Sequence, residues 1–257
     1  MEDHECGELL LPKIGPVKVK WSRSLPSDPS SVTVVKDAAG RYFASFVIEA
    51  EIEPLPHTTC DVGIDLGLCH FAVLSDGTKV ANPRFLRRAE KRLKKAQRSL
   101  SRKQKGSNNR AKARVKLARA HARVADARKN FQHQLSTRIM RENQAVYVED
   151  LCVQGLARTR LAKSVRDAGW SAFVRMLDYK ATRYGRTFAK VDRLLASSQT
   201  CSKCWQVDGP KPLHVRTWTC QGCKTTHDRD ENSARIVLAA GRADRGNASG
   251  GAVRPAA

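Results

Sequence analysis

The sequence lacks a hydrophobic run long enough to cross a membrane. No stretch of its 257 residues approaches the roughly eighteen apolar side chains in succession that a membrane-spanning helix needs. The residues after Met1 are acidic, whereas a secretory signal has a basic stretch that leads into an apolar one. We therefore expect a soluble, cytoplasmic protein, associated with the nucleoid if it is bacterial.

Acidic residues are also scarce. The chain has 25 Asp and Glu against 47 Lys and Arg, a formal net charge of +22. Such an excess attracts polyanions and makes their binding sensitive to salt. The excess is concentrated between Arg84 and Asn130, where nineteen basic residues accompany only Glu90 and Asp126. A solvated helical face would normally mix charges of both signs, so nucleic acid is the expected partner of this segment.

Half of the eight cysteines show no spacing that suggests a disulfide framework, which is typical of a reducing cytosol. The scattered ones are Cys6, Cys60, Cys69 and Cys152. Two Cys-x-x-Cys knuckles, Cys201/Cys204 and Cys220/Cys223, are instead separated by fifteen residues. Four thiolates at this spacing predict a structural zinc site of the ribbon type, and two disulfides in a secreted protein are the alternative. With four cysteines present, His214 and His227 are not needed as ligands.

Alternating apolar residues predict a small β region, and the order of the later segments predicts a mixed α/β unit. Residues 8–53 read as strands, with a hairpin turn at 36–40 and a linker at 54–59. Further strands are expected at 62–65, 71–74, 78–81, 145–149 and 187–191. Apolar side chains that recur every three or four positions predict a basic helical hairpin over 84–141, and helices at 170–184 and 232–240.

Three acidic residues occupy positions where a carboxylate is costly without a cation. Asp65 lies within or just after the first strand of the mixed unit, Glu149 ends its fourth strand, and Asp230 begins the last helix. Converging acids of this kind suit divalent magnesium or manganese. Each has another interpretation: Asp65 as a surface residue, Asp150 in place of Glu149, and the run from Asp228 to Glu231 as a helix capping box.

The motifs in combination resemble a known family. Gly63-Ile64-Asp65-Leu66-Gly67 and Val148-Glu149-Asp150-Leu151 are followed by the two cysteine knuckles and by Asp228-Arg229-Asp230-Glu231-Asn232. In this order they resemble the transposon-encoded TnpB (OrfB) proteins, relatives of the type V CRISPR effector nucleases, over about residues 8 to 240.

This resemblance implies a RuvC-like nuclease domain of RNase H fold with the catalytic triad Asp65, Glu149 and Asp230. The domains it implies are a partial β-barrel wedge segment at 1–56, a nuclease domain at 57–240 with a helical hairpin insert at 84–141 and a zinc ribbon insert at 197–227, and a disordered tail at 241–257. Most of the wedge and a preceding recognition domain are missing, so the chain is expected to be truncated at its amino terminus. The implied partners are DNA, a guide RNA and a transposon-encoded transposase.

The resemblance also gives a mechanism: two Mg²⁺ or Mn²⁺ ions bridged by Asp65 would promote phosphodiester hydrolysis. Basic side chains of the hairpin would bind the phosphate backbone without reading sequence. These side chains are Arg87, Arg88, Lys91, Arg92, Lys94, Lys95, Arg98, Arg102 and Lys103. Trp205 and Trp218 flank the knuckles, and packing within the ribbon is favoured over stacking on bases.

Two other functions remain open from the sequence. The motif at 63–67 also opens the actin type of ATPase, but the further glycine-rich phosphate loops of that class are absent from the chain. A truncated relative that binds DNA or RNA, and regulates transposition without cutting, is the non-enzymatic alternative.

Overall fold

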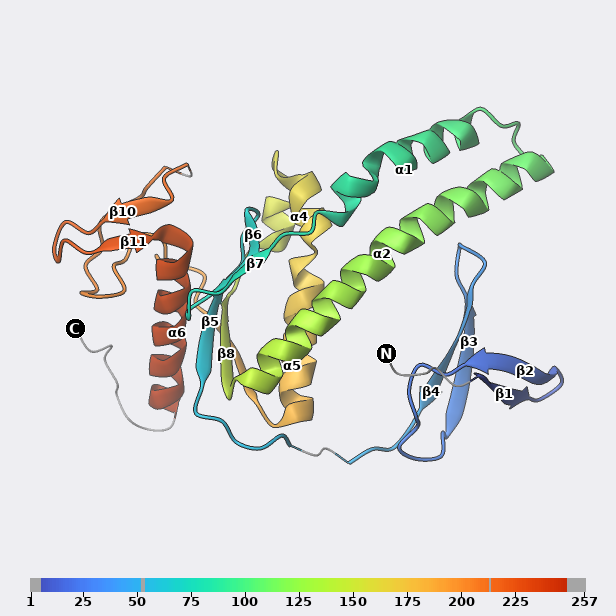
Figure 1. Ribbon diagram of the computed structural model, residues 1–257, viewed down its shortest axis with the longest axis horizontal. Helices are drawn as coiled ribbons and strands as arrows, with labels where there is room; N and C mark the ends of the chain where they lie inside the picture. The colour runs from blue at the N-terminus through green and yellow to red at the C-terminus, as the bar shows by residue number, and fades with distance from the viewer. Residues whose placement is uncertain (1–5, 52–53, 213, 249–257) are drawn as a thin grey trace. The chain divides into compact units, whose positions relative to one another are not determined.

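The structure is a computed structural model that describes residues 6–51, 54–212 and 214–248 (Figure 1). The chain divides into two compact units, residues 1–51 and 52–257, which are described separately. In the described part, no helix combines the length and the apolar character that spanning a bilayer would require.

The first unit consists of two β-hairpins. Strands β1 (Cys6–Leu11) and β2 (Gly15–Lys20) form one, and β3 (Ser31–Lys36) and β4 (Tyr42–Val47) form the other, with the predicted turn between them. In the described residues the two hairpins belong to separate two-stranded sheets. Trp21 stacks on Phe46 at 5.3 Å, and within residues 6–51 no ladder of hydrogen bonds joins the two hairpins, so the partial β-barrel stays a prediction.

The second unit contains a five-stranded mixed sheet in the order β7-β6-β5-β8-β9. Its strands are β5 (Asp61–Asp65), β6 (His70–Leu74), β7 (Lys79–Ala81), β8 (Ala145–Glu149) and β9 (Thr187–Val191). Strands β5, β8 and β9 are parallel, and β6 runs antiparallel to both β5 and β7. The predicted strands and the mixed α/β class are confirmed.

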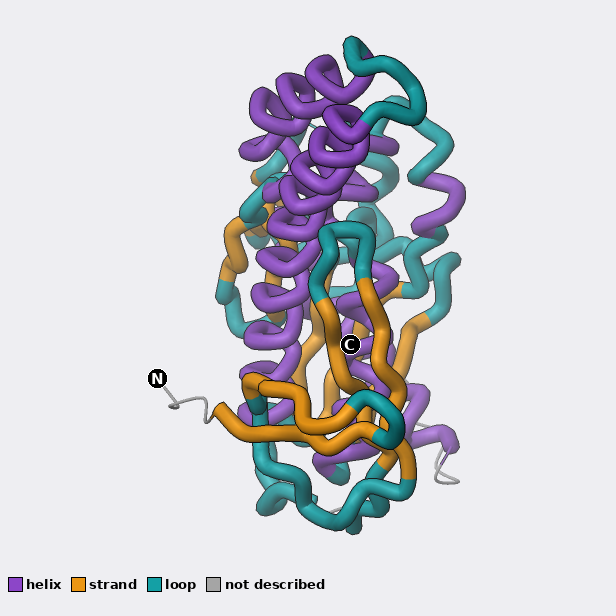
Figure 2. The backbone as a smooth tube through the Cα atoms, turned by 90° about the vertical axis from the view of Figure 1, so that its right-hand side faces the viewer, coloured by secondary structure: helices purple, strands orange, loops and turns teal. Residues whose placement is uncertain are grey.

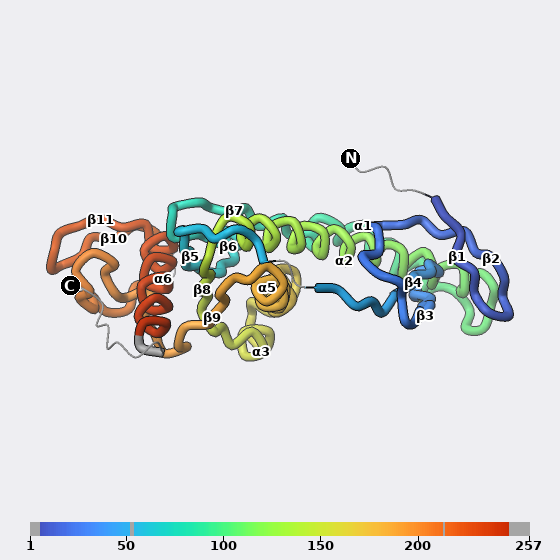
Figure 3. The backbone as a smooth tube through the Cα atoms, turned by 90° about the horizontal axis from the view of Figure 1, so that it is seen from below, coloured from blue at the N-terminus to red at the C-terminus, as the bar shows by residue number. Residues whose placement is uncertain are grey.

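Helices cover both faces of this sheet (Figure 3). Helices α2 (Asn108–Glu142) and α5 (Trp170–Tyr184) pack on one face, and α6 (Arg229–Ala248) packs on the other. Alternation along the strands decides which side chain faces which layer. Ile64 and Val148 are buried toward α2 and α5, so the residues next to them in sequence point toward α6.

Gly63 allows α6 to approach β5 closely. A Cβ atom at this position would lie 2.2 Å from the carbonyl oxygen of Ala234 and 2.5 Å from the backbone nitrogen of Leu238. Both contacts are with the helix backbone, which cannot move aside without displacing the whole helix. The first glycine of the 63–67 motif is therefore required by helix–sheet packing.

Helix α6 is longer than the sequence suggested. It runs to Ala248, so the prediction of a disordered tail is wrong for residues 241–248, and residues 249–257 lie outside the described part. Gly241 packs against the ring of Tyr147, where a Cβ would meet Cδ1 at 2.1 Å. Arg242 pairs with Asp61 at 3.0 Å and Arg245 pairs with it at 3.5 Å. These tertiary contacts extend a helix whose Gly/Ala-rich composition alone gives little reason for order.

The basic hairpin is formed by α1 (Phe85–Ser101) and α2, which lie side by side in two views (Figure 2). Leu93 contacts Ala120 and Val124 in a small core between the helices. The side chain of Ser107 caps α2 by accepting a hydrogen bond from the backbone nitrogen of Arg110 at 3.2 Å. Two short helices for which the sequence gave no expectation, α3 (Val153–Leu156) and α4 (Ala162–Ala168), follow β8.

A buried lysine joins α5 to α2. The ammonium of Lys180, a residue that is 5% exposed, donates hydrogen bonds to the hydroxyls of Ser136 and Thr137, both at 2.7 Å, and to the carbonyl of His133 at 2.8 Å. Its three protons therefore have three acceptors. Burial and, to a smaller extent, the positive charge of Arg183 lower the pKa of Lys180 from 10.5 to about 8.

This lysine predicts a pH dependence of stability. Between pH 8 and 10.5 the unfolded chain holds a proton on Lys180 that the folded chain has lost, so the free energy of unfolding should rise with pH, by roughly 1–3 kcal/mol. Urea denaturation at a series of pH values should show this rise in the wild type and in Lys129→Met, whose lysine is exposed. Lys180→Met should lack it, and an equal rise in all three proteins would contradict the assignment.

Candidate functional site

The three predicted acids lie at one edge of the sheet. Ile64 of β5 pairs with Val148 of β8, so Asp65 and Glu149, the next residue of each strand, end two neighbouring parallel strands. Strand alternation turns both toward the face covered by α6. Asp230 lies in the first turn of that helix. The fold thus brings acids from three distant segments to one place.

The electrostatics of Asp65 reflect the proximity of the other two acids. Burial raises the pKa of Asp65 well above its usual value, and the negative charges of Glu149 and then Asp230 raise it further. Burial also raises the pKa of Glu149. The negative charges that raise the pKa of Asp65 reflect repulsion, which a bound cation would relieve.

Two of the acids are held by protein partners. The hydroxyl of Ser197 donates a hydrogen bond to Glu149 and accepts one from Ser233 of α6, at 2.7 Å. Asp230 accepts from the guanidinium of Arg216, with 3.1 Å between Nη1 and Oδ1, and the same guanidinium lies 3.2 Å from Cys69 Sγ. The sequence analysis did not identify Arg216 or Ser197. The only sequence signal was their place in the segment between the second and third acid.

Asp228 is a helix cap, as one interpretation of the acidic run proposed. Its Oδ1 accepts hydrogen bonds from the backbone nitrogens of Asp230 and Glu231, both at 3.1 Å, and its Oδ2 pairs with Lys79 at 2.6 Å. The cap leaves the neighbouring Asp230 available for another role. Asp150, the alternative to Glu149, pairs instead with Arg193 and Lys190.

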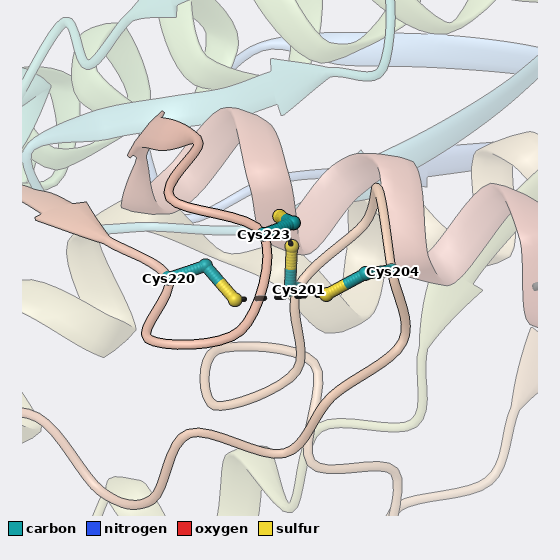
Figure 4. Close-up of side chains that lie close together, drawn as sticks. All are labelled: Cys201, Cys204, Cys220 and Cys223. Carbon is teal, nitrogen blue, oxygen red and sulfur yellow. Dashed lines mark hydrogen bonds between the residues drawn. The ribbon is translucent and has the colours of Figure 1, made fainter.

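The four knuckle cysteines come together (Figure 4). Their sulfur atoms all lie within 4.8 Å of one another, with Cys201 and Cys223 3.6 Å apart and Cys204 and Cys220 also 3.6 Å apart. Burial raises the pKa of Cys201 to about 12, and hydrogen bonds from Thr225 lower the pKa of Cys223 to about 6. Four sulfurs at one point are the donor set of a tetrahedral thiolate site, so this cluster can hold a metal such as zinc.

Among the described residues, this cysteine cluster is the only group of three or more Cys, His, Asp or Glu ligand atoms within 4.8 Å of one another. The carboxylates of Asp65, Glu149 and Asp230 therefore stand farther apart, with Glu149 directed to Ser197 and Asp230 to Arg216. For one cation to bind all three carboxylates, Glu149 would have to release Ser197 and Asp230 would have to release Arg216.

Aromatic rings pack around the cysteine cluster. Trp218, on β10 (Thr217–Thr219), is buried beside Cys201 and Cys220, and its ring lies 5.0 Å from that of His227 on β11 (Thr226–Asp228). Lys211 Nζ lies 3.7 Å from the centre of the Trp218 ring. The packing role expected for Trp218 is confirmed, whereas Trp205 is half-buried. His227 is buried, with Nε2 3.1 Å from Cys201 Sγ, and His214 is exposed.

Asn232 joins this small unit to α6. The side chain, 1% exposed, donates to the carbonyl of Thr200 at 2.8 Å and accepts from the backbone nitrogen of Ser202 at 2.9 Å. The Asn232 side chain thus hydrogen-bonds to the backbone on both sides of the first knuckle cysteine, Cys201. Because Asn232 follows Asp230 by two positions, the cysteine cluster and the acid edge are fixed to the same turn of helix.

The nine basic residues predicted to contact nucleic acid are all exposed. They lie on α1 or immediately after it, at Arg87, Arg88, Lys91, Arg92, Lys94, Lys95, Arg98, Arg102 and Lys103. Lys94 pairs with Glu90 at 2.9 Å, and Arg87 approaches the Ser164 hydroxyl at 3.4 Å. The helix therefore presents an almost uncompensated positive surface.

Comparison with known proteins supports the resemblance drawn from the motifs. Residues 45–160 match a family of OrfB proteins described as "Probable transposase", and residues 170–237 match one described as "Cas12f1-like, TNB domain". A Streptomyces pristinaespiralis protein named "Putative RNA-guided DNA endonuclease" is 49% identical over 253 residues, which cover 97% of this chain and 62% of that protein.

A second relative and a solved structure agree. The Escherichia coli (strain K12) protein "Putative RNA-guided DNA endonuclease InsQ" is 31% identical, over 94% of this chain and 64% of that protein. The chain thus spans less than two thirds of the length of both relatives. A chain of the "Cas12f1-sgRNA-target DNA complex" superposes with a TM-score of 0.50 at 17% identity, over 77% of this chain and 41% of that one, which shows a shared fold.

The cysteine cluster predicts a measurable metal content. The purified protein should carry about one equivalent of zinc, because four converging thiolates make a closed tetrahedral site. Elemental analysis should show this metal lost in Cys220→Ser and retained in Cys152→Ser, whose cysteine is exposed and outside the cluster. Trypsin should then cut the segment 197–227 in Cys220→Ser only. Equal zinc in both variants would contradict the site.

Proposed function

Because the chain belongs to the OrfB family of transposon-encoded proteins, we propose that it is the nuclease portion of a metal-dependent, RNA-guided DNA endonuclease. The observation that supports this most directly is the meeting of Asp65, Glu149 and Asp230 at one sheet edge. The names of the Streptomyces pristinaespiralis and Escherichia coli relatives support the same activity.

The proposed domain is RNase H-like, of the RuvC type, over residues 57–240. Support comes from the mixed sheet, in which an antiparallel meander, β5 to β7, continues into parallel strands β8 and β9 with helices on both faces. The helical hairpin at 84–141 and a zinc ribbon at 197–227 are its inserts. Residues 1–56 would then be what this chain has of a wedge domain.

The three acids would hold Mg²⁺ or Mn²⁺. Their fit rests on the donor set: carboxylate oxygens are the preferred ligands of these ions, and the raised pKa of Asp65 reflects a concentration of negative charge. When bound, such cations stabilise the charge that develops on phosphate oxygens and provide a nucleophilic water at neutral pH.

The chain's own residues would prepare this site. Ser197 orients Glu149 through a hydrogen bond, and Ser233 in turn orients Ser197. Arg216 balances the charge of Asp230 while no cation is bound, and it brings a guanidinium to the place where a phosphate would bind. The ribbon segment that carries Arg216 is held to α6 by Asn232, so the zinc site would act as a structural support for the acid edge.

The exposed cations of α1 would bind nucleic acid through its phosphates. Their contacts would be non-specific, so a base-paired guide RNA would have to supply sequence recognition. DNA is the proposed substrate, and a transposon-encoded transposase is a further proposed partner. Because the chain spans less than two thirds of its relatives, the guiding step is proposed for the complete assembly.

Cleavage of labelled single-stranded DNA in Mg²⁺ tests the proposal. Asp65→Asn removes one negative charge at nearly constant volume and should reduce the cleavage rate by at least about a hundredfold, since a carboxylate that would hold the cation is lost. Asp178→Asn makes the same chemical change at an exposed position on α5 and should cleave like the wild type. Equal rates in the wild type and Asp65→Asn would contradict the catalytic assignment.

The second candidate is a protein that binds DNA or RNA and regulates transposition without cutting. The exposed positive surface of α1 would suffice for it, and the ion pair between Arg216 and Asp230 would then be a permanent structural contact. Salt-sensitive binding with no cleavage by the wild type in either Mg²⁺ or Mn²⁺ would favour this candidate.

A further inference from the structure

A cleft of about 940 Å³ opens between the two helices of the basic hairpin, in its outer half. Small side chains create it: Ala96 and Ser99 of α1 face Ala111 and Ala120 of α2, where larger residues would fill the space. Most of the lining surface is apolar. The two helices are in direct contact nearer the base, at Leu93 and Val124, so the cleft has a closed inner end there.

The rim of the cleft is strongly basic. No acidic residue lines it, and seven cations do: Arg92, Lys95, Lys112, Arg114, Lys116, Arg119 and Arg123. Five of the seven belong to α2, and only Arg92 and Lys95 are among the residues that the sequence analysis assigned to nucleic acid. An apolar floor between rows of positive charge complements a chain with phosphates along its backbone and flat apolar groups attached to it.

A smaller hollow follows the cleft toward the base of the hairpin. This hollow, of about 430 Å³, shares Arg92 and Arg123 with the cleft and continues to Phe85, at the base of α1. Strands β5, β6 and β7 alternate in direction, so the end of β7 lies at the same edge as Asp65. Asn82, just after β7, donates to the carbonyl of Leu68, just after β5, at 3.1 Å. The hairpin therefore begins at the same edge of the sheet as Asp65, but it extends from the face covered by α2, away from α6 (Figure 1).

We propose that this cleft is a channel for one single strand of nucleic acid that runs along the hairpin, between its base and its tip. Residues Arg92 to Ser99 span roughly 11 Å along α1, at 1.5 Å per residue, so the cleft holds a segment of only a few nucleotides. A duplex is wider than an α-helix and does not enter a cleft between two helices in contact. No aromatic side chain lines the cleft, so the strand binds without base preference.

Lysine substitutions matched for charge test the channel. Lys112→Gln/Lys116→Gln removes two rim cations, and Lys105→Gln/Lys129→Gln removes two exposed cations of the same hairpin outside the cleft. Fluorescence anisotropy with labelled 20-nucleotide oligo-dT or oligo-U, and with a 20-base-pair DNA duplex, measures binding without added Mg²⁺. The rim variant should bind the single strands roughly tenfold more weakly than the outer variant. Its log K against log salt slope should be shallower by about 1.4, for two lost phosphate contacts.

A second variant fills the channel without changing charge. Ala96→Leu keeps the helix propensity of α1 high and places a larger side chain on the cleft floor, so it should weaken single-strand binding and leave duplex binding unchanged. Far-ultraviolet circular dichroism should show the same helix content in all variants, since every substituted residue other than Ala96 is exposed.

Several outcomes would overturn the channel. One is an equal loss of single-strand affinity in the rim and outer variants, and another is a duplex affinity that falls as much as the single-strand affinity. A third is binding of labelled poly-glutamate without any binding of oligonucleotides, which would indicate an acidic protein partner. The channel rests on the proposed nucleic-acid function, but its test measures oligonucleotide binding alone and needs no cleavage. Loss of cleavage with an intact channel would reject the nuclease and keep the channel.

Discussion

The close packing of α6 on β5 is the contact on which the rest of the site depends. With no side chain at Gly63, the helix backbone lies directly against the strand, and its first turn places Asp230 beside Asp65 and Glu149. A side chain at position 63 would displace the helix and separate the acids. Repulsion between the gathered acids destabilises the fold. The favourable free energy of burying apolar side chains on both faces of the sheet offsets this repulsion.

The same helix turn supports the cysteine cluster. Asn232 holds both sides of the first knuckle, and Ser233 reaches Glu149 through Ser197. A small unit with almost no core of its own is thereby fixed to the main domain by a few buried polar contacts, which are strong because no water competes for them. Metal binding and acid geometry are therefore physically connected, although the two sites use different ligands.

The basic hairpin is packed less tightly than the sheet. Apolar side chains hold its helices together only near the base, and the outer half has alanines where a packed bundle would have leucines. Seven like charges line that opening and repel one another, which favours an open cleft over a closed one until a polyanion binds. Shape and charge in this segment thus favour a polyanionic ligand, whereas the acids at the sheet edge favour a cation.

The sequence by itself determined the five strands of the main sheet, the long helices, the four cysteines and the three candidate acids, because strand alternation, helical periodicity and ligand spacing are local patterns. It also carried the family motifs at 63–67 and 228–234. Only the tertiary structure decided that Arg216 meets Asp230, that α6 continues past Gly241, and that the hairpin encloses a cleft. Those features depend on contacts between segments far apart in the chain, for which a single sequence has no local signal.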